Sequence, residues 1–193
     1  MLFSPLQAGA LTLPNRILMA PLTRTRADAG HMPNALMAEY YAQRASAGLV
    51  ITECTMVAPG TSAFNAEPGI YSPEQVEAWK QVTAAVHAKG GRIFMQIWHA
   101  GRAAHPAMND GTENVSASAI AIEGEVHTPQ GKQPNALPRE LRADEIPALV
   151  QAYAQAARNA FAAGFDGVDV HGANGYLIDQ FLRDGANKRS DAY

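Results

Sequence analysis

The sequence lacks several features that would point to common functional classes. Cys54 is its only cysteine, which excludes an intrachain disulfide and a CxxC metal site. No apolar run approaches the length of about 20 residues that a transmembrane helix needs, and the N-terminus has no charged region followed by an apolar core. The net charge is −3 and no basic block is present, which argues against nucleic acid as a partner. We therefore expect a cytoplasmic protein that binds neither nucleic acid nor membrane.

What the chain does contain is ordinary globular composition with a regular alternation of patterns. Of its 193 residues, 47% are hydrophobic and 17% are charged, so it can bury a large core. Short apolar runs predict strands, three-four spacing of apolar residues predicts helices, and Ser72-Pro73 with Gln75 is a strong helix start. The predicted strands are 16–20, 49–55, 92–97 and 165–171; the predicted helices are 34–47, 73–89 and 143–163. In the last helix one face is predicted to be buried over five turns, and it consists of Ile146, Leu149, Val150, Tyr153, Ala157, Ala160, Phe161 and Gly164.

Strands that alternate with helices predict parallel strands joined by right-handed crossovers. Polar residues follow each strand and never precede it, as in open sheets and barrels that bind ligands at the carboxyl ends of their strands. No GxGxxG or GxxxxGK[ST] motif follows any strand, which counts against a nucleotide-binding open sheet. Outside this alternation, residues 1–13 predict a small hairpin, with the apolar pieces 1–3 and 10–13 as its strands around Gly9. Residues 103–140 form an irregular stretch that is either functional or contains a hairpin.

Three polar side chains, His171, Asn174 and Tyr176, follow the last strand within six positions. Alternation along a strand places Asp169 and His171 on one face and the valines 168 and 170 on the other, so the polar pair faces the barrel interior. The plain alternative is a polar loop whose Asn caps a helix. By the same parity, Gln96 shares a face with Trp98. It either contacts a flat ligand or is a core glutamine bonded to backbone.

Other titratable residues offer weaker hypotheses. The remaining histidines have no metal-ligand spacing, so we expect no metal site. Glu53 and Asp169 could form a glycosidase-like pair of carboxylates, but buried structural partners of backbone or arginine are the favoured interpretation. No lysine ends a predicted strand, which argues against Schiff-base chemistry.

Several motifs, in this order and spacing, resemble those of the Old Yellow Enzyme family of FMN-dependent ene-reductases. They span the chain and together are highly specific. They are Ala20-Pro21-Leu22-Thr23-Arg24, Thr52-Glu53-Cys54-Thr55, Pro68-Gly69-Ile70-Tyr71-Ser72, Gln96-Ile97-Trp98-His99-Ala100-Gly101-Arg102, His171-Gly172-Ala173-Asn174-Gly175-Tyr176-Leu177 and Asp179-Gln180-Phe181-Leu182.

The resemblance implies a (β/α)8 TIM barrel that holds FMN non-covalently at the carboxyl ends of its strands. Pro21, Leu22 and Thr23 would line the flavin, with the Thr23 hydroxyl near O4 and N5. The small side chain of Cys54 would allow the backbone at this position to approach the pyrimidine ring of the flavin. We do not expect its thiol to act as a nucleophile. Gln96 would bond the same pyrimidine edge, and Trp98 would shape the substrate pocket.

The reaction implied by the resemblance is the reduction of activated alkenes such as enones, and also of nitro compounds or nitrate esters. NADPH or NADH would deliver hydride to flavin N5, which then passes it to the alkene. His171 and Asn174 would bond the substrate oxygen, where negative charge develops. Tyr176, a phenol with a pKa near ~10, would donate the proton.

The motifs cover only four of the eight strands of such a barrel. We expect residues 1–193 to form a single domain, an incomplete barrel. The loops that bind the flavin phosphate, and an arginine near flavin N1 and O2, belong to the other half. The favoured explanation is a piece of a longer enzyme; the alternatives are one part of a split enzyme completed by a second chain, and two copies that associate to imitate a whole barrel. The alternative function is a catalytically inactive half-barrel or scaffold that needs a complementary chain.

Overall fold

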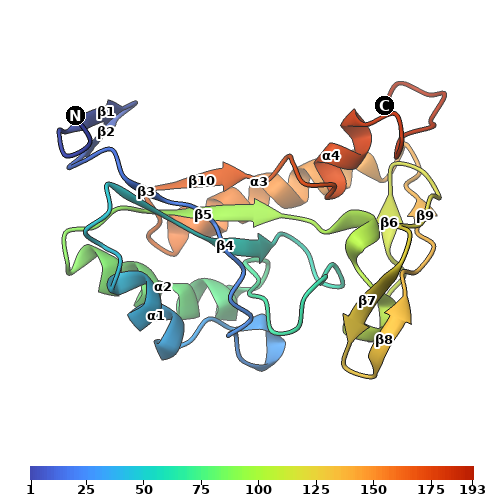
Figure 1. Ribbon diagram of the computed structural model, residues 1–193, viewed down its shortest axis with the longest axis horizontal. Helices are drawn as coiled ribbons and strands as arrows, with labels where there is room; N and C mark the ends of the chain where they lie inside the picture. Colours follow the sequence, from blue (N-terminus) through green and yellow to red (C-terminus); the bar gives the residue numbers. More distant parts are fainter.

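A computed structural model describes residues 1–193, and its centre is a parallel four-stranded sheet with the order β10-β5-β4-β3 (Figure 1). Neighbours in the sheet are consecutive core strands of the chain, connected by one helix each. The strands are β3 (Leu18–Met19), β4 (Leu49–Met56), β5 (Ile93–Trp98) and β10 (Gly167–Val170); the helices are α1 (Ala35–Ala42), α2 (Pro73–His87) and α3 (Ile146–Ala162). The predicted alternation and parallel pairing are confirmed.

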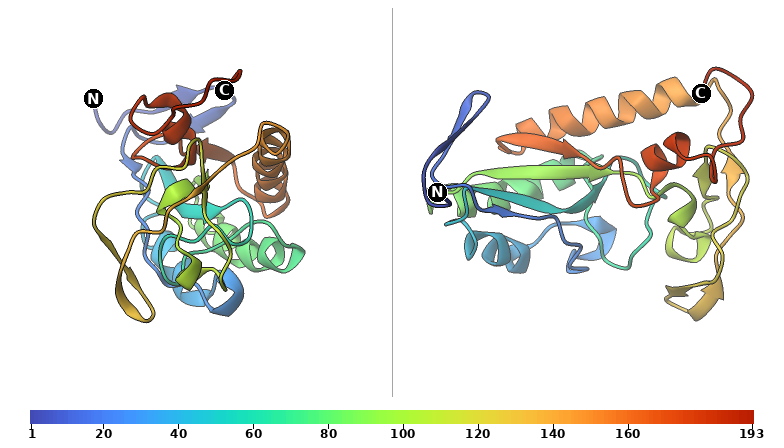
Figure 2. Two further views of the ribbon diagram at one scale, coloured as in Figure 1. Left: turned by 90° about the vertical axis from the view of Figure 1, so that its right-hand side faces the viewer. Right: turned by 45° about the horizontal axis from the view of Figure 1, so that its top comes forward.

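The three connecting helices pack on one side of the sheet, and the main core lies between the two layers (Figure 2). Ile93, Met95 and Ile97 point into this core from β5. Trp79 of α2 is fully buried there, and its indole N–H donates to the carbonyl of Gly69 at 2.9 Å. Burying each large apolar side chain of this kind contributes roughly 1.5–3 kcal/mol. The opposite face of β5 is therefore left for Gln96 and its neighbours, as strand parity predicted.

The helix ends follow from local sequence. Asn34 caps α1 by accepting the N–H of Met37 at 3.1 Å. Ser72 and Gln75 form the predicted capping box at the start of α2. Two predictions are wrong in extent: α1 ends at Ala42 instead of residue 47, and α3 begins at Ile146 instead of residue 143.

The predicted buried face of α3 is only partly buried. Ile146 and Ala160 are buried, whereas Val150 is 58% and Phe161 59% exposed, so the prediction is wrong for these two. The reason is that no element of the chain covers that side of the helix. Val170 at the end of β10 is likewise 53% exposed, because β10 has a neighbour on one edge only.

One irregularity interrupts β4. Ile51 pairs with Phe94 and Cys54 with Gln96, so β4 has one residue more than β5 between the two pairs. Such a β-bulge reverses the alternation of side chains beyond it. Cys54 accordingly faces the same side as Gln96. In an unbroken strand it would share the helix-facing side of Val50.

The remaining elements lie at the two ends of the sheet. The N-terminal hairpin is confirmed, but its first strand is β1 (Leu6–Ala8), not residues 1–3, and it pairs with β2 (Leu11–Leu13). Residues 103–140 contain the hairpin β7 (Glu125–Thr128) and β8 (Gly131–Pro134), and the short pair β6 (Val115–Ser116) and β9 (Arg139–Glu140). The last helix is α4 (Leu177–Leu182). None of the helices has the length and apolarity needed to cross a bilayer.

Candidate functional site

A cavity of about 410 Å³ opens at the carboxyl ends of the four parallel strands. Residues from the loops after β3 and β10 and from β4 and β5 line it, as expected of a parallel barrel. Eight of the nine residues named as site candidates from the sequence line this cavity. The complete lining is Pro21, Leu22, Thr23, Cys54, Phe64, Gln96, His171, Asn174 and Tyr176.

Trp98 is the ninth candidate, and it lies behind the cavity wall instead of lining it. Its side chain is 0% exposed. The Tyr176 ring meets it edge-on at 4.4 Å between centroids, and the rings of His171 and Phe64 stack on it at 6.2 and 6.0 Å. Trp98 thus shapes the cavity by fixing the orientation of three lining rings. Edge and stacked aromatic pairs of this kind contribute about 0.5–1.5 kcal/mol each beyond their buried area.

The loop after β10 has an unusual backbone that presents Asn174 to the cavity. Asn174 has φ +59° and Gly175 has φ +80°, so two consecutive residues are left-handed. The loop is held from both ends: the His171 N–H donates to the Ile97 carbonyl at 3.0 Å, and the Gly175 N–H donates to Asp179 at 2.6 Å. The capping residue of α4 is Tyr176, so the interpretation of Asn174 as a helix cap is wrong. A left-handed non-glycine residue costs on the order of 1 kcal/mol or more, and such strain concentrates at functional sites.

The titratable groups of this loop are held neutral. Burial lowers the pKa of His171, opposed by the nearby carboxylates of Asp169 and Asp179. Burial also raises the pKa of Tyr176, and negative charge on Cys54 or Glu67 would raise it further. A neutral imidazole donates through one ring N–H, and the protonated phenol donates through its O–H. At neutral pH the site therefore offers hydrogen-bond donors without carrying a charged imidazolium.

Cys54 and Gln96 form the floor of the cavity. The Cys54 thiol donates to Gln96 Oε1 at 3.1 Å, and Gln96 Nε2 donates to Asp169 Oδ2 at 2.7 Å. The side chain of Gln96 is thus bonded to two other side chains, not to backbone as in the core-glutamine alternative. One N–H and one lone pair of its amide remain for a ligand. Burial raises the pKa of the Cys54 thiol to about 12, so it is not a nucleophile at neutral pH.

Glu53 supports the loop that carries Pro21, Leu22 and Thr23. Its Oε2 accepts the backbone N–H of Arg24 at 3.1 Å, and its Oε1 accepts the Tyr41 hydroxyl at 2.9 Å. Burial raises the pKa of this carboxyl, while the bonds from Arg24 and Tyr41 lower it. The favoured interpretation of Glu53 as a buried structural partner of backbone is confirmed. Glu53 and Asp169 bond to different partners, because Asp169 Oδ2 accepts the Gln96 amide, which argues against the glycosidase-like pair.

Two residues near the cavity were missed in the sequence. Phe64 lines it and stacks on Trp98. Phe64 is a lone large apolar residue in a polar loop, and this pattern could have indicated that it lines a pocket. Glu67 is fully buried, accepts the Ala63 N–H at 3.1 Å through Oε1, and has no partner for Oε2. Burial raises the pKa of Glu67 to about 8. Nothing in its local sequence indicates that this glutamate is buried.

Comparison with known proteins gives consistent findings. The sequence model of the NADH:flavin oxidoreductase / NADH oxidase family matches residues 1–193. A Leishmania infantum protein named "Probable flavin mononucleotide-dependent alkene reductase" is 50% identical over 198 residues, covering all of this chain and 54% of that protein. The structure of the old yellow enzyme homologue from Zymomonas mobilis superposes with a TM-score of 0.96 at 53% identity, covering 98% of this chain and 53% of that one. Morphinone reductase in complex with tetrahydroNAD gives 0.94 at 48% identity, covering 100% and 55%. The chain thus spans about half the length of the relatives it matches.

Proposed function

Because the chain belongs to the NADH:flavin oxidoreductase / NADH oxidase family, we propose that it forms the substrate-activating half of an FMN-dependent ene-reductase. The resemblance to the Old Yellow Enzyme family and the half-barrel fold are confirmed by the relatives and their structures. The activity of a whole enzyme, its substrates and the roles of single residues are the proposal. We also propose that residues 1–193 form one domain.

The lining of the cavity supports a flavin ring as its ligand. It offers apolar surface from Pro21 and Leu22 and a hydroxyl from Thr23. The Gln96 amide still has one N–H and one lone pair free for a ligand. A flat heterocycle with polar edges needs this combination of apolar contact and a few placed polar groups. Thr23 and Gln96 would hold the ring by its polar edge, while the small Cys54 side chain leaves room for close approach. Bound FMN would supply hydride drawn from NADPH or NADH.

The substrate would be an alkene activated by a carbonyl or nitro group. His171 and Asn174 would donate hydrogen bonds to its oxygen, where negative charge grows as hydride reaches the β-carbon. Burial lowers the pKa of His171, so the imidazole that donates its N–H to the oxygen is neutral and not an imidazolium cation. Tyr176 stays protonated because burial raises its pKa, so it is available to give the proton to the α-carbon.

The observation that carries the proposal is the convergence of His171, Asn174 and Tyr176 on the same cavity as Thr23 and Gln96. The test uses a completed barrel, in which residues 1–193 are joined to the remaining part of the Zymomonas mobilis homologue. Tyr176→Phe should slow reduction of cyclohexenone by roughly 10²–10⁴-fold, the usual contribution of a general acid. Reduction of the bound flavin by NADPH should stay near the parent rate. An unchanged alkene rate in Tyr176→Phe, or a parent barrel without alkene reductase activity, would overturn the proposal.

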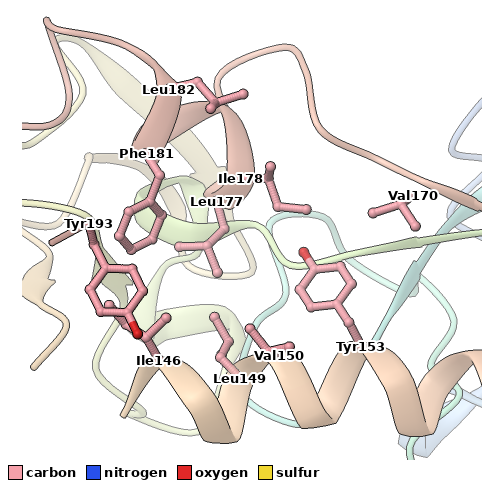
Figure 3. A pocket seen from close by; sticks show the side chains of 10 residues that line it. All are labelled: Ile146, Leu149, Val150, Tyr153, Val170, Leu177, Ile178, Phe181, Leu182 and Tyr193. Atoms are coloured by element: carbon pink, nitrogen blue, oxygen red, sulfur yellow. The ribbon is translucent and has the colours of Figure 1, made fainter. Parts of the chain in front are cut away.

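The structure also offers support for a second half-barrel as the partner. A groove of about 530 Å³ runs beside the open edge of β10, and every residue that lines it is hydrophobic. Figure 3 shows side chains from α3 facing those from α4 across it, with Val170 of β10 and Tyr193 at its ends. A solvent-open groove lined only by hydrophobic residues favours association with a further apolar surface. We propose that further strands and helices, on the same polypeptide or on another chain, cover this groove and supply the site for the flavin phosphate.

The second candidate function is a catalytically inactive half-barrel or scaffold. The open sheet edges and the exposed Val150, Phe161 and Val170 favour it for the 193-residue chain by itself. A purified chain that is colourless and runs as a dimer would support the scaffold. A yellow preparation that oxidises NADPH in the presence of cyclohexenone would support the enzyme.

A further inference from the structure

Gln180 of α4 is a buried junction outside the cavity. Its side chain is 0% exposed and its amide makes four hydrogen bonds. Nε2 donates to the carbonyls of Gly175 at 2.7 Å and Ala100 at 3.2 Å. Oε1 accepts the backbone N–H of Arg102 at 3.2 Å and the hydroxyl of Ser116 at 3.0 Å. A primary amide has two N–H groups and two lone pairs, so its full capacity is used.

These bonds join three segments that are far apart in the sequence. Gly175 belongs to the loop of His171, Asn174 and Tyr176; Ala100 and Arg102 belong to the turn after β5; Ser116 belongs to β6. The turn after β5 approaches so closely that a Cβ on Gly101 would lie 2.2 Å from Gln180 Oε1. Gly101 also has φ +60°, which favours glycine. The turn is therefore shaped to receive this amide.

The contact to Gly175 bears directly on the cavity, because Gly175 lies between two of its lining residues. Asn174 and Tyr176 flank it in the sequence, and both line the cavity. The Gly175 N–H is held by Asp179 at 2.6 Å and its carbonyl by Gln180 at 2.7 Å. Both sides of this peptide segment are thus fixed by α4. A left-handed Asn174 followed by a left-handed glycine needs such support to keep a single conformation.

We propose that Gln180 is a positioning residue that fixes Asn174 and Tyr176 in the geometry needed to bind and protonate substrate. This inference rests on the proposed function of the loop. An amide is required because two of its four partners are carbonyls, which need donors. A carboxylate of the same size would keep the bonds from Arg102 and Ser116 but would place an oxygen against the carbonyls of Gly175 and Ala100.

The test is the isosteric substitution Gln180→Glu, made in the full chain and in the completed barrel. Hydrogen exchange of residues 173–177 in the full chain, relative to wild type at the same pH, should be about tenfold or more faster at pH 8, because a buried carbonyl loses its donor. At pH 5 the protonated carboxyl can donate to one carbonyl, so the ratio should fall back toward one. In the completed barrel, kcat/KM for the alkene should fall by about tenfold at pH 8 and recover in the same pH range. Glu at an exposed site, Gln155→Glu on α3, is the matched control and should change neither readout.

Other charged groups near the junction are Asp179, Arg183 and Arg102, and the wild-type chain measured at each pH is the reference for their titration. Loop exchange equal to wild type at both pH values would overturn the proposal. So would a uniform loss of protection across the whole chain that does not depend on pH, because that outcome indicates a general packing role. If Gln180→Glu does not fold at pH 8, Gly101→Ala provides the second variant. It displaces the amide sterically and should loosen the same loop at both pH values, and an unaffected loop would refute the inference. If the loop loosens but the completed barrel keeps its alkene rate, then Gln180 does hold the loop, but the loop does not have the proposed function.

Discussion

Glu67 gives the sharpest quantitative prediction, because it is a buried carboxyl without a cation. Its side chain is fully buried, one oxygen accepts the Ala63 N–H, and the other has no partner. Burial raises its pKa from 4.5 to about 8. Below pH 4.5 the carboxyl is protonated in both folded and unfolded chains, so the shift costs no stability. As the pH rises toward 8, the unfolded chain releases the proton while the folded chain retains it, so folding becomes less favourable.

The size of this effect follows from the two pKa values. At ~1.4 kcal/mol per pH unit, ionisation of Glu67 should remove on the order of 5 kcal/mol of folding free energy between pH 4.5 and pH 8. That is a large share of the roughly 5–15 kcal/mol that stabilises a typical domain. Glu67→Gln keeps an oxygen for the Ala63 N–H and carries no titrating proton. The variant should therefore be several kcal/mol more stable than wild type at pH 8, by roughly 3–5 kcal/mol, and nearly equal to it at pH 4.5.

The assay is urea unfolding followed by circular dichroism at several pH values from 4.5 to 8.5. Wild type should lose stability steeply over this range, and Glu67→Gln should show a much flatter dependence. Glu77→Gln, at an exposed glutamate paired only with Lys80, is the control and should keep the wild-type slope. Parallel pH profiles for wild type and Glu67→Gln would refute the assignment of a raised pKa to Glu67, and with it the burial of its carboxyl without a cation.

Three further predictions follow from other parts of the molecule. The Cys54 thiol has a pKa of about 12, so Ellman's reagent at pH 8 should label it only after urea unfolding; rapid labelling of the folded chain would contradict its burial. Ser72→Ala removes the capping box of α2 and should cost ~1 kcal/mol in urea unfolding, whereas Ser190→Ala in an exposed segment should cost little. The isolated 193-residue chain should bind FMN weakly, because the lining of its cavity includes no arginine or lysine for the phosphate; tight stoichiometric quenching in a flavin fluorescence titration would refute this.

The sequence predicted the fold well where local pattern and packing agree. The start of α2 at Ser72 and the whole of β4 follow from capping residues and a β-branched run, and both are confirmed. The buried face of α3 could not be predicted correctly, because the pattern of Val150 and Phe161 is that of a helix covered on two sides. Periodicity records which residues are suited to burial. It does not show whether the covering element is present in the same chain.

The candidate site was predicted more completely than its supports. The nine candidate residues lie in short motifs at the carboxyl ends of the strands, and eight of them line one cavity. Gln180 bonds to partners distant in sequence, such as Ser116, and no local pattern reveals such contacts. Glu67 accepts the N–H of Ala63 only four residues away, and its local sequence gives no sign that the carboxyl is buried. Strand parity gave the right face for Gln96 and Asp169, which pair directly in the sheet.

For β4, parity alone would have given the wrong face, and the bulge explains how the site is nevertheless assembled. Without the extra residue, Cys54 would point toward the helices and Glu53 toward the cavity. The bulge reverses both. It brings the small Cys54 side chain to the cavity floor and turns the Glu53 carboxyl to Tyr41 and the Arg24 N–H, where it holds the loop of Thr23. The Glu53 carboxyl is thereby turned away from the cavity, where negative charge would develop on the substrate oxygen in the proposed reaction. Deleting the extra residue of β4 should therefore disrupt both the floor of the cavity and the loop of Thr23, because Glu53 holds that loop through Arg24, 29 residues away in sequence.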